Sequence, residues 1–232
     1  KRVIKKRIIR LRSLIREELD DPVVVEMPLT IYLNGRELVT LLCTPEKIDR
    51  LALGFLRSEG LIKSLDDLAD IRCRYDDGLV EVELKEDSTG LESLYSKRTI
   101  TSGCGKGTIF YNVIDSLRSE PLTGKLQVPA TKAMKVIREL EEKALLFKAT
   151  GGVHSAALAS GDQIIFFYED IGRHNAVDKI IGECLNAGIE MDGKYLVVSG
   201  RISSEILLKA AKLKIELLIS RSAPTSLSIE LA

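Results

Sequence analysis

The chain has 232 residues, of which 45% are apolar and 29% charged, and it contains no tryptophan. This composition is typical of a soluble protein with one large or two small domains. Basic and acidic residues both number 34, so the overall charge gives no argument for nucleic-acid binding. No apolar run approaches the roughly 20 residues of a membrane crossing, and no signal-peptide pattern is present. We therefore expect a cytoplasmic protein that binds neither nucleic acid nor membrane.

The N-terminal segment is strongly basic. Residues 1–12 hold seven lysines and arginines and no acidic residue. Such a block of like charge predicts a frayed, solvated terminus, and an arm that docks an acidic partner is the alternative. We place a basic N-terminal arm over residues 1–22.

The next segment predicts a small α+β domain over residues 23–98. Asn34-Gly35 tolerates positive φ and favours a two-residue hairpin between two apolar strands. Thr44-Pro45 predicts the start of a helix that Gly60 can end. A second strand pair flanks Asp76-Asp77-Gly78. The polar residues 86–98 mark the domain boundary.

Residues 99–232 predict a larger α/β domain. Thr131 can cap a long helix, and an apolar stripe on that helix consists of Met134, Ile137, Leu140 and Leu145. From Gly151 onward, short apolar strands alternate with helical segments. Helices between strands require crossover connections, so the sheet should be partly parallel.

The four cysteines differ in their surroundings. Three lie within apolar periodic segments, where a thiol usually packs as a small hydrophobe, namely Cys43, Cys73 and Cys184. Cys104 instead lies between Gly103 and Gly105, and the nearby Lys106 favours its thiolate form. The alternative is an inert cysteine in a glycine-rich turn. The wide spacing predicts neither a disulfide framework nor a zinc site.

Several polar turns follow apolar strands, which is where α/β proteins bind ligands. Their glycines, hydroxyl groups and arginines suit an anionic ligand, although ordinary turns and helix caps would use the same residue types. The turns after strands comprise the segment Glu169–Lys179 with Arg173, His174 and Asn175, then Ser199-Gly200-Arg201 and Ser222–Ser226. A further candidate, Gly151-Gly152-Val153-His154, stands at the entry to a strand.

Taken in order, these motifs resemble the formate dehydrogenase accessory protein family, FdhD, a group of sulfur carriers. The resemblance runs from about Pro28 to the end of the chain. It rests on Pro28-Leu29, Leu51–Leu56 with Ser58-Glu59-Gly60, Thr101–Gly105, Thr150–His154, Glu169–Lys179, Ser199–Arg201 and Ser222–Leu227.

The resemblance implies a sulfurtransferase that receives sulfur as a persulfide on Cys104 from a cysteine desulfurase. The sulfur would then pass to a molybdenum bis(guanine dinucleotide) cofactor, bound transiently before its insertion into formate dehydrogenase. It also implies a homodimer and a cytidine-deaminase-like three-layer larger domain. Lys106 would stabilise the thiolate. The pocket would be lined by Gly151, Gly152, His154, Arg173, His174, Asn175, Lys179 and Arg201.

The chain departs from the family pattern in two places. Gly107 stands where the family often has a second cysteine, and Ala232 ends the chain where members usually continue into a further strand that helps hold the dinucleotide. No metal site is expected, and a deaminase is disfavoured because Ser155-Ala156 follows His154 in place of the His-x-Glu motif. A cofactor-binding chaperone without sulfur chemistry is the main alternative, and a nucleotide hydrolase is the weaker one.

Overall fold

The computed structural model describes residues 1–85, 99–100, 108–109, 121–122 and 124–232. Within these residues it contains two four-stranded sheets, two two-stranded ribbons and helices on the faces of the four-stranded sheets. No helix in the described part of the chain is long and apolar enough to cross a membrane.

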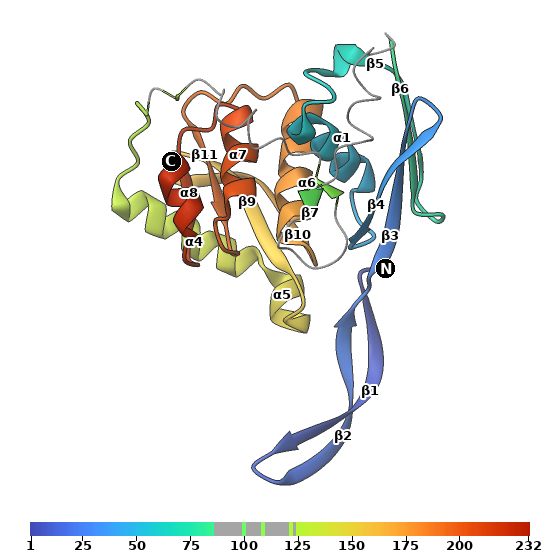
Figure 1. Ribbon diagram of the computed structural model, residues 1–232. Helices are drawn as coiled ribbons and strands as arrows, with labels where there is room; N and C mark the ends of the chain where they lie inside the picture. The colour runs from blue at the N-terminus through green and yellow to red at the C-terminus, as the bar shows by residue number, and fades with distance from the viewer. Residues whose placement is uncertain (86–98, 101–107, 110–120, 123) are drawn as a thin grey trace.

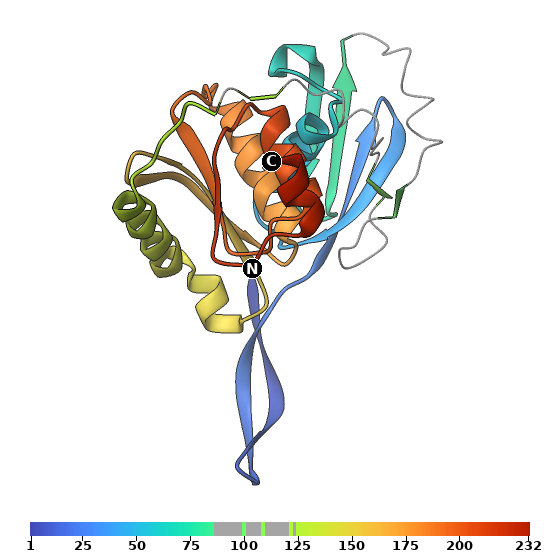
Figure 2. The same ribbon diagram turned by 60° about the vertical axis from the view of Figure 1, so that its left-hand side comes forward.

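The first 24 residues form a long antiparallel ribbon that projects from the rest of the molecule (Figures 1 and 2). Its strands are β1 (Val3–Arg12) and β2 (Ile15–Val24). The expectation of a frayed terminus is therefore wrong. Basic side chains of β1 lie opposite acidic side chains of β2, and Arg10 pairs with Asp21 at 2.7 Å. The acids that follow the basic block in the sequence relieve its repulsion.

The N-terminal lobe is a four-stranded sheet in the order β4-β3-β6-β5, with one long helix packed on it. The β3–β6 pair is parallel, and the other two pairs are antiparallel. Its elements are β3 (Met27–Leu33), β4 (Arg36–Cys43), α1 (Ile48–Glu59), the 3-10 turn η1 (Leu65–Asp67), β5 (Leu68–Arg74) and β6 (Leu79–Leu84).

The turns of this lobe test the local predictions. Asn34 and Gly35 have φ of 50° and 74°, which confirms the two-residue hairpin. Gly60 ends α1 in the left-handed conformation, as predicted. The predicted helix start at Thr44 is wrong: α1 begins at Ile48, after Lys47. Thr44 is fully buried and bonds to the other lobe instead.

The C-terminal lobe contains a mixed sheet in the order β10-β9-β11-β12. Only the β11–β12 pair is parallel, and α7 provides its crossover, so the sheet is partly parallel as predicted. The elements are α4 (Ala130–Lys143), α5 (Leu145–Thr150), β9 (His154–Ser160), β10 (Gln163–Asp170), α6 (Arg173–Asn186), β11 (Lys194–Val198), α7 (Ser204–Lys212), β12 (Leu218–Ser220) and α8 (Ser226–Leu231).

Helices cover both faces of this sheet. On one face, α4 buries Val136 and Leu140 against the sheet, and on the other face α6 and α7 pack together (Figure 1). The predicted apolar stripe of α4 is partly wrong, because Met134 is 50% and Leu145 is 67% exposed. Leu145 belongs to a separate helix, α5. The mixed α/β class holds, and the likeness to cytidine deaminases stays a prediction.

The two lobes meet where α1 crosses α6, and glycines make this contact possible. A Cβ atom at Gly54 would lie 1.8 Å from the carbonyl oxygen of Asp178. A Cβ atom at Gly182 would lie 1.9 Å from the carbonyl oxygen of Arg50. The two helix backbones therefore touch directly, and this crossing fixes how the first turn of α6 sits against the N-terminal lobe.

Candidate functional site

Three of the predicted polar turns meet at one end of the C-terminal sheet. His154 begins β9 directly opposite Asp170, the last residue of β10. β11 ends at Val198, which pairs with Ala156 of β9. The turn at Gly200 and the first turn of α6 consequently lie beside His154, as expected for loops that follow the carboxyl ends of strands.

The closest approach within this site is at Gly200. A Cβ atom there would lie 3.2 Å from Cβ of Arg173 and 3.4 Å from Nδ1 of His154. His154 is half-buried, and burial lowers its pKa, with the positive charges of Arg173 and His174 acting in the same direction. His154 is thus a neutral imidazole at physiological pH. The structure brings His154, Arg173 and His174 together, as the sequence predicted.

His174 has a carboxylate partner on a different helix. Its Nε2 atom lies 2.8 Å from Oε2 of Glu205, in the first turn of α7, and both side chains are largely buried. The pair is close but not well aligned for a hydrogen bond. The interaction with His174 lowers the pKa of Glu205 against the effect of burial, so Glu205 is ionised at neutral pH.

Serine side chains hold the turns of this edge in place. Ser199 Oγ accepts a bond from the backbone N–H of Ser155 at 2.8 Å. Ser220 Oγ donates to the carbonyl of Gly200, and Ser222 Oγ donates to the carbonyl of Ser199, both at 2.8 Å. These hydroxyl groups are therefore occupied by structural bonds. Arg201, which follows Gly200 in this turn, is exposed.

Lys179 and Asn175 are not at an open surface. Lys179 is fully buried, and its Nζ lies 2.6 Å from Asp170 Oδ2 and donates to Thr44 Oγ1 at 2.7 Å. Asn175 Nδ2 donates to Asp170 and to the carbonyl of Leu42. The network joins β4 to β10 and α6. Both side chains are engaged in a bond network between the lobes, and their predicted contacts with a ligand stay a prediction.

A second buried network lies further along α6. Lys209 of α7 donates to both oxygens of Asp178, at 2.7 and 2.6 Å, and Ser58 at the end of α1 donates to Asp178 Oδ1 at 3.0 Å. The adjacent Glu59 is 8% exposed, and its carboxylate has no hydrogen-bond partner among the described residues. Burial raises the pKa of Glu59, while the ammonium groups of Lys209 and Lys212 oppose that rise.

The double glycine before His154 is exposed. Gly151 ends α5 with φ of 66°, which a side chain would strain. A Cβ atom at Gly152 would lie 3.0 Å from Val24, so this turn touches the base of the N-terminal ribbon. Glu169 accepts bonds from the backbone N–H groups of Leu146 and Phe147 and so caps the start of α5.

Cys104 and Lys106 lie outside the described residues. The short strands β7 (Thr99–Ile100) and β8 (Thr108–Ile109), which flank that segment, pair antiparallel. The described thiols match the prediction of small hydrophobes, because burial is the main factor that raises their pKa. The values are about 12 for Cys43, about 11 for Cys73 and about 12 for Cys184.

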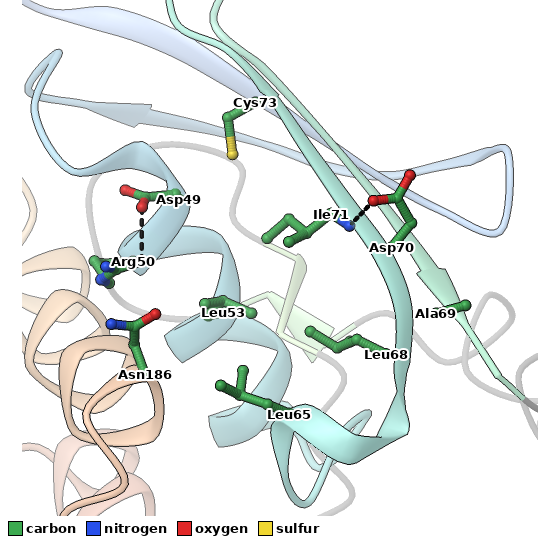
Figure 3. Close-up of a pocket in the computed structure, with 10 residues that line it drawn as sticks. All are labelled: Asp49, Arg50, Leu53, Leu65, Leu68, Ala69, Asp70, Ile71, Cys73 and Asn186. Atoms are coloured by element: carbon green, nitrogen blue, oxygen red, sulfur yellow. Dashed lines mark hydrogen bonds and ion pairs between the residues drawn. The ribbon is translucent and has the colours of Figure 1, made fainter.

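A separate pocket of about 550 Å³ lies between α1 and β5 (Figure 3). Asp49, Arg50 and Cys73 line it together with apolar side chains, and Asn186 approaches from α6. Its charged groups are already paired, since Arg50 binds both Asp49 and Glu183. This pocket is distinct from the edge that carries the histidines.

Sequence reasoning missed Glu205 and Thr44 as partners of predicted site residues. An acid in the first turn of a helix is an ordinary stabilising feature, and a Thr-Pro pair is an ordinary helix start. Neither carries a signal of a long-range contact. Within the part of the chain that the structure describes, no three His, Cys, Asp or Glu side chains are grouped so that they could hold a metal ion.

Comparison with known proteins defines the class to which this fold and site belong. The model of the FdhD/NarQ family matches residues 24–232. The chain is 42% identical to the sulfur carrier protein FdhD of Geobacillus kaustophilus and 41% identical to that of Bacillus subtilis. Each match covers 93% of this chain and 82% of the relative.

A solved structure agrees with these relatives. The crystal structure of a protein from Desulfotalea psychrophila, described as a formate dehydrogenase accessory protein, superposes with a TM-score of 0.80 at 26% identity. The superposition covers 100% of this chain and 89% of that one. The chain therefore belongs to the FdhD/NarQ family.

Proposed function

We propose that this protein is a sulfur carrier and sulfurtransferase that serves formate dehydrogenase. The observation that carries the proposal is that three of the four thiols lie in surroundings that raise their pKa to about 11 or 12. Cys104 is the remaining candidate, and its sequence setting beside Lys106 favours the thiolate. The names of the relatives support a sulfur carrier of this family.

In the loading step, the Cys104 thiolate attacks the terminal sulfur of a persulfide on a cysteine desulfurase. A new S–S bond forms on Cys104, the donor's S–S bond breaks, and its electron pair leaves with the donor thiolate. In the delivery step, the acceptor supplies an electron pair to the terminal sulfur, and the Cys104 thiolate is released. The acceptor is the molybdenum bis(guanine dinucleotide) cofactor, bound as cargo, and the carrier is a homodimer.

The edge beside Gly200 is the proposed site for the anionic part of that cargo. Arg173 offers a guanidinium fork, and its Nε atom is buried without a partner among the described residues. His174, the neutral His154 and the exposed Arg201 add donors at the same edge. The exposed backbone at Gly151 and Gly152 completes the site. Lys179 and Asn175 support it from the core.

The test is restoration of formate dehydrogenase activity in a bacterial strain that lacks its own family member. The wild-type protein should restore activity, Cys104→Ala should not, and Cys73→Ala should do so as a matched control. Guanosine diphosphate binding by Cys104→Ala should stay at the wild-type level. Full activity with Cys104→Ala would contradict sulfur transfer and favour a cofactor-binding chaperone.

A further inference from the structure

The unpaired buried side-chain atoms of the described residues are concentrated in one region, the junction of α1, α6 and α7. They belong to Glu59, Arg173, His174 and Glu205, and the His174 and Glu205 atoms face each other at 2.8 Å without the alignment of a hydrogen bond. Native proteins leave few buried polar atoms unpaired, and each such atom calls for an explanation. These unpaired atoms gather around the first turn of α6, next to the proposed cargo site. We infer that the groups are kept for a function, because leaving them unpaired does not stabilise the core.

We propose that Glu205 is a positioning residue that fixes the tautomer and orientation of His174 at the cargo site. The inference rests on the proposed function, in which His174 faces the anionic part of the cargo. It assigns to Glu205 no direct contact with the cargo. Its role is exerted through the imidazole of His174.

The 2.8 Å distance between Nε2 and Oε2 determines which nitrogen carries the proton. An ionised carboxylate can only accept a hydrogen bond. A deprotonated Nε2 would turn its lone pair toward the negative oxygen and be repelled. Whenever the imidazole carries a single proton, that proton must therefore lie on Nε2, as in histidines that a carboxylate orients at metal and catalytic sites.

This tautomer leaves the other nitrogen of His174 for the ligand. Nδ1 makes no hydrogen bond to a described residue and is not among the buried unpaired atoms. It is consequently free to accept a proton or, once protonated, to donate to an anionic oxygen. His174 and Arg173 are neighbours in the first turn of α6, and both act on the pKa of His154, so the two side chains lie at the same edge.

The surrounding charges do not offer His174 a second carboxylate within ion-pair distance. Of its neighbours, Arg173 on α6 is cationic and His154 on β9 is neutral. Lys209 on α7 is held by Asp178, and burial together with the charge of Glu205 raises the pKa of Glu59 at the end of α1. Among the described residues, Glu205 is the only acid whose carboxylate lies within ion-pair distance of His174.

The chain contains only two histidines, which makes a direct test practical. Long-range proton–nitrogen NMR spectra at mildly alkaline pH report the tautomer of each imidazole, and a His154→Gln variant assigns the two signals. We expect His174 to be a single Nε2–H tautomer in the wild type. Glu205→Gln should convert it to a mixture, whereas Glu190→Gln, the same change at an exposed loop position, should not.

Guanosine diphosphate is the ligand probe, measured by calorimetry on the same proteins. Glu205→Gln should weaken its binding roughly tenfold, the lower end of the effect of removing an orienting carboxylate from a ligating histidine. An unchanged tautomer in Glu205→Gln would overturn the proposal, whether or not affinity falls, and so would an unchanged affinity despite a shifted tautomer.

The two proposals can fail separately. If the wild type does not bind guanosine diphosphate while Glu205→Gln still shifts the tautomer, the cargo assignment fails and the orientation of His174 by Glu205 stands. Suppose that the wild type binds guanosine diphosphate and supports formate dehydrogenase, but that the His174 tautomer is unchanged in Glu205→Gln. In that case the positioning role alone is refuted.

Discussion

The α1–α6 crossing gives a stability prediction that can be worked out from distances. In Gly182→Ala, the new Cβ would lie 1.9 Å from the carbonyl oxygen of Arg50. Close carbon–oxygen contacts in proteins are about 3.3 Å, so the helices must separate by more than about 1 Å. A gap of that size forfeits roughly a quarter to a half of the dispersion energy at the affected contacts.

Two effects of opposite sign determine the net change. Overpacking a tight interface lowers the free energy of unfolding by about 3 kcal/mol, the upper end of the usual range. Replacing a helical glycine by alanine raises it by about 1 kcal/mol, because alanine has the higher helix propensity. We expect Gly182→Ala to lower the free energy of unfolding by about 2 kcal/mol, measured by urea denaturation followed by circular dichroism. Gly54→Ala should behave in the same way, because its Cβ meets the same crossing.

The double variant distinguishes this reasoning from a general loss of stability. Once the helices have separated for one alanine, the second should cost less, so Gly54→Ala with Gly182→Ala should be less destabilised than the sum of the single variants. Gly54→Ala combined with Leu140→Ala, in the separate α4 core, should be additive. A Gly182→Ala protein more stable than the wild type would refute the account, because helix propensity would then dominate.

Three further predictions concern the charged and titratable groups. Lys179→Met should destabilise the fold by about 3–5 kcal/mol in urea denaturation, because it leaves the Asp170 carboxylate buried without its cation; a loss below about 1 kcal/mol would contradict the network's role. A thiol reagent at mildly alkaline pH should label Cys104 quickly, and the three thiols with raised pKa slowly, in the folded protein; equal labelling rates in wild type and Cys104→Ala would contradict this. His154 has a lowered pKa when folded, so its contribution to stability is complete above the unfolded value near 6.5 and is lost as pH falls through the folded value. Denaturation across this pH range should show a shallower decline for His154→Gln, and identical profiles would contradict the assigned shift.

Local signals in the sequence predicted much of the fold. Asn34-Gly35 and Gly60 act through their own backbone preferences, so the hairpin and the end of α1 could be read without tertiary information. Strand and helix alternation after Gly151 likewise gave the partly parallel sheet. The ordered arm could not be predicted from residues 1–12 alone, because the acids that pair with them follow later in the chain, in β2.

The site was only partly predictable for a related reason. The rule that ligands gather beyond strand ends brought the turns at Arg173, His174 and Gly200 to one edge. His154, at the start of β9, was placed in the same pocket by the family resemblance. The rule could not separate side chains that reach the edge from those that turn into the core, and Lys179 and Asn175 turn inward to Asp170. Contacts such as His174 with Glu205 join residues far apart in the chain, and no local pattern records them.

Sulfur loading tests the central claim most directly. The protein is incubated with a cysteine desulfurase and cysteine, digested without reductant, and analysed by mass spectrometry, with Cys104→Ala and Cys184→Ala in parallel. We predict that the peptide containing Cys104 gains the mass of one sulfur atom in the wild type and in Cys184→Ala, and that Cys104→Ala gains none. Sulfur on another cysteine of Cys104→Ala, or no sulfur on the wild type, would contradict the account.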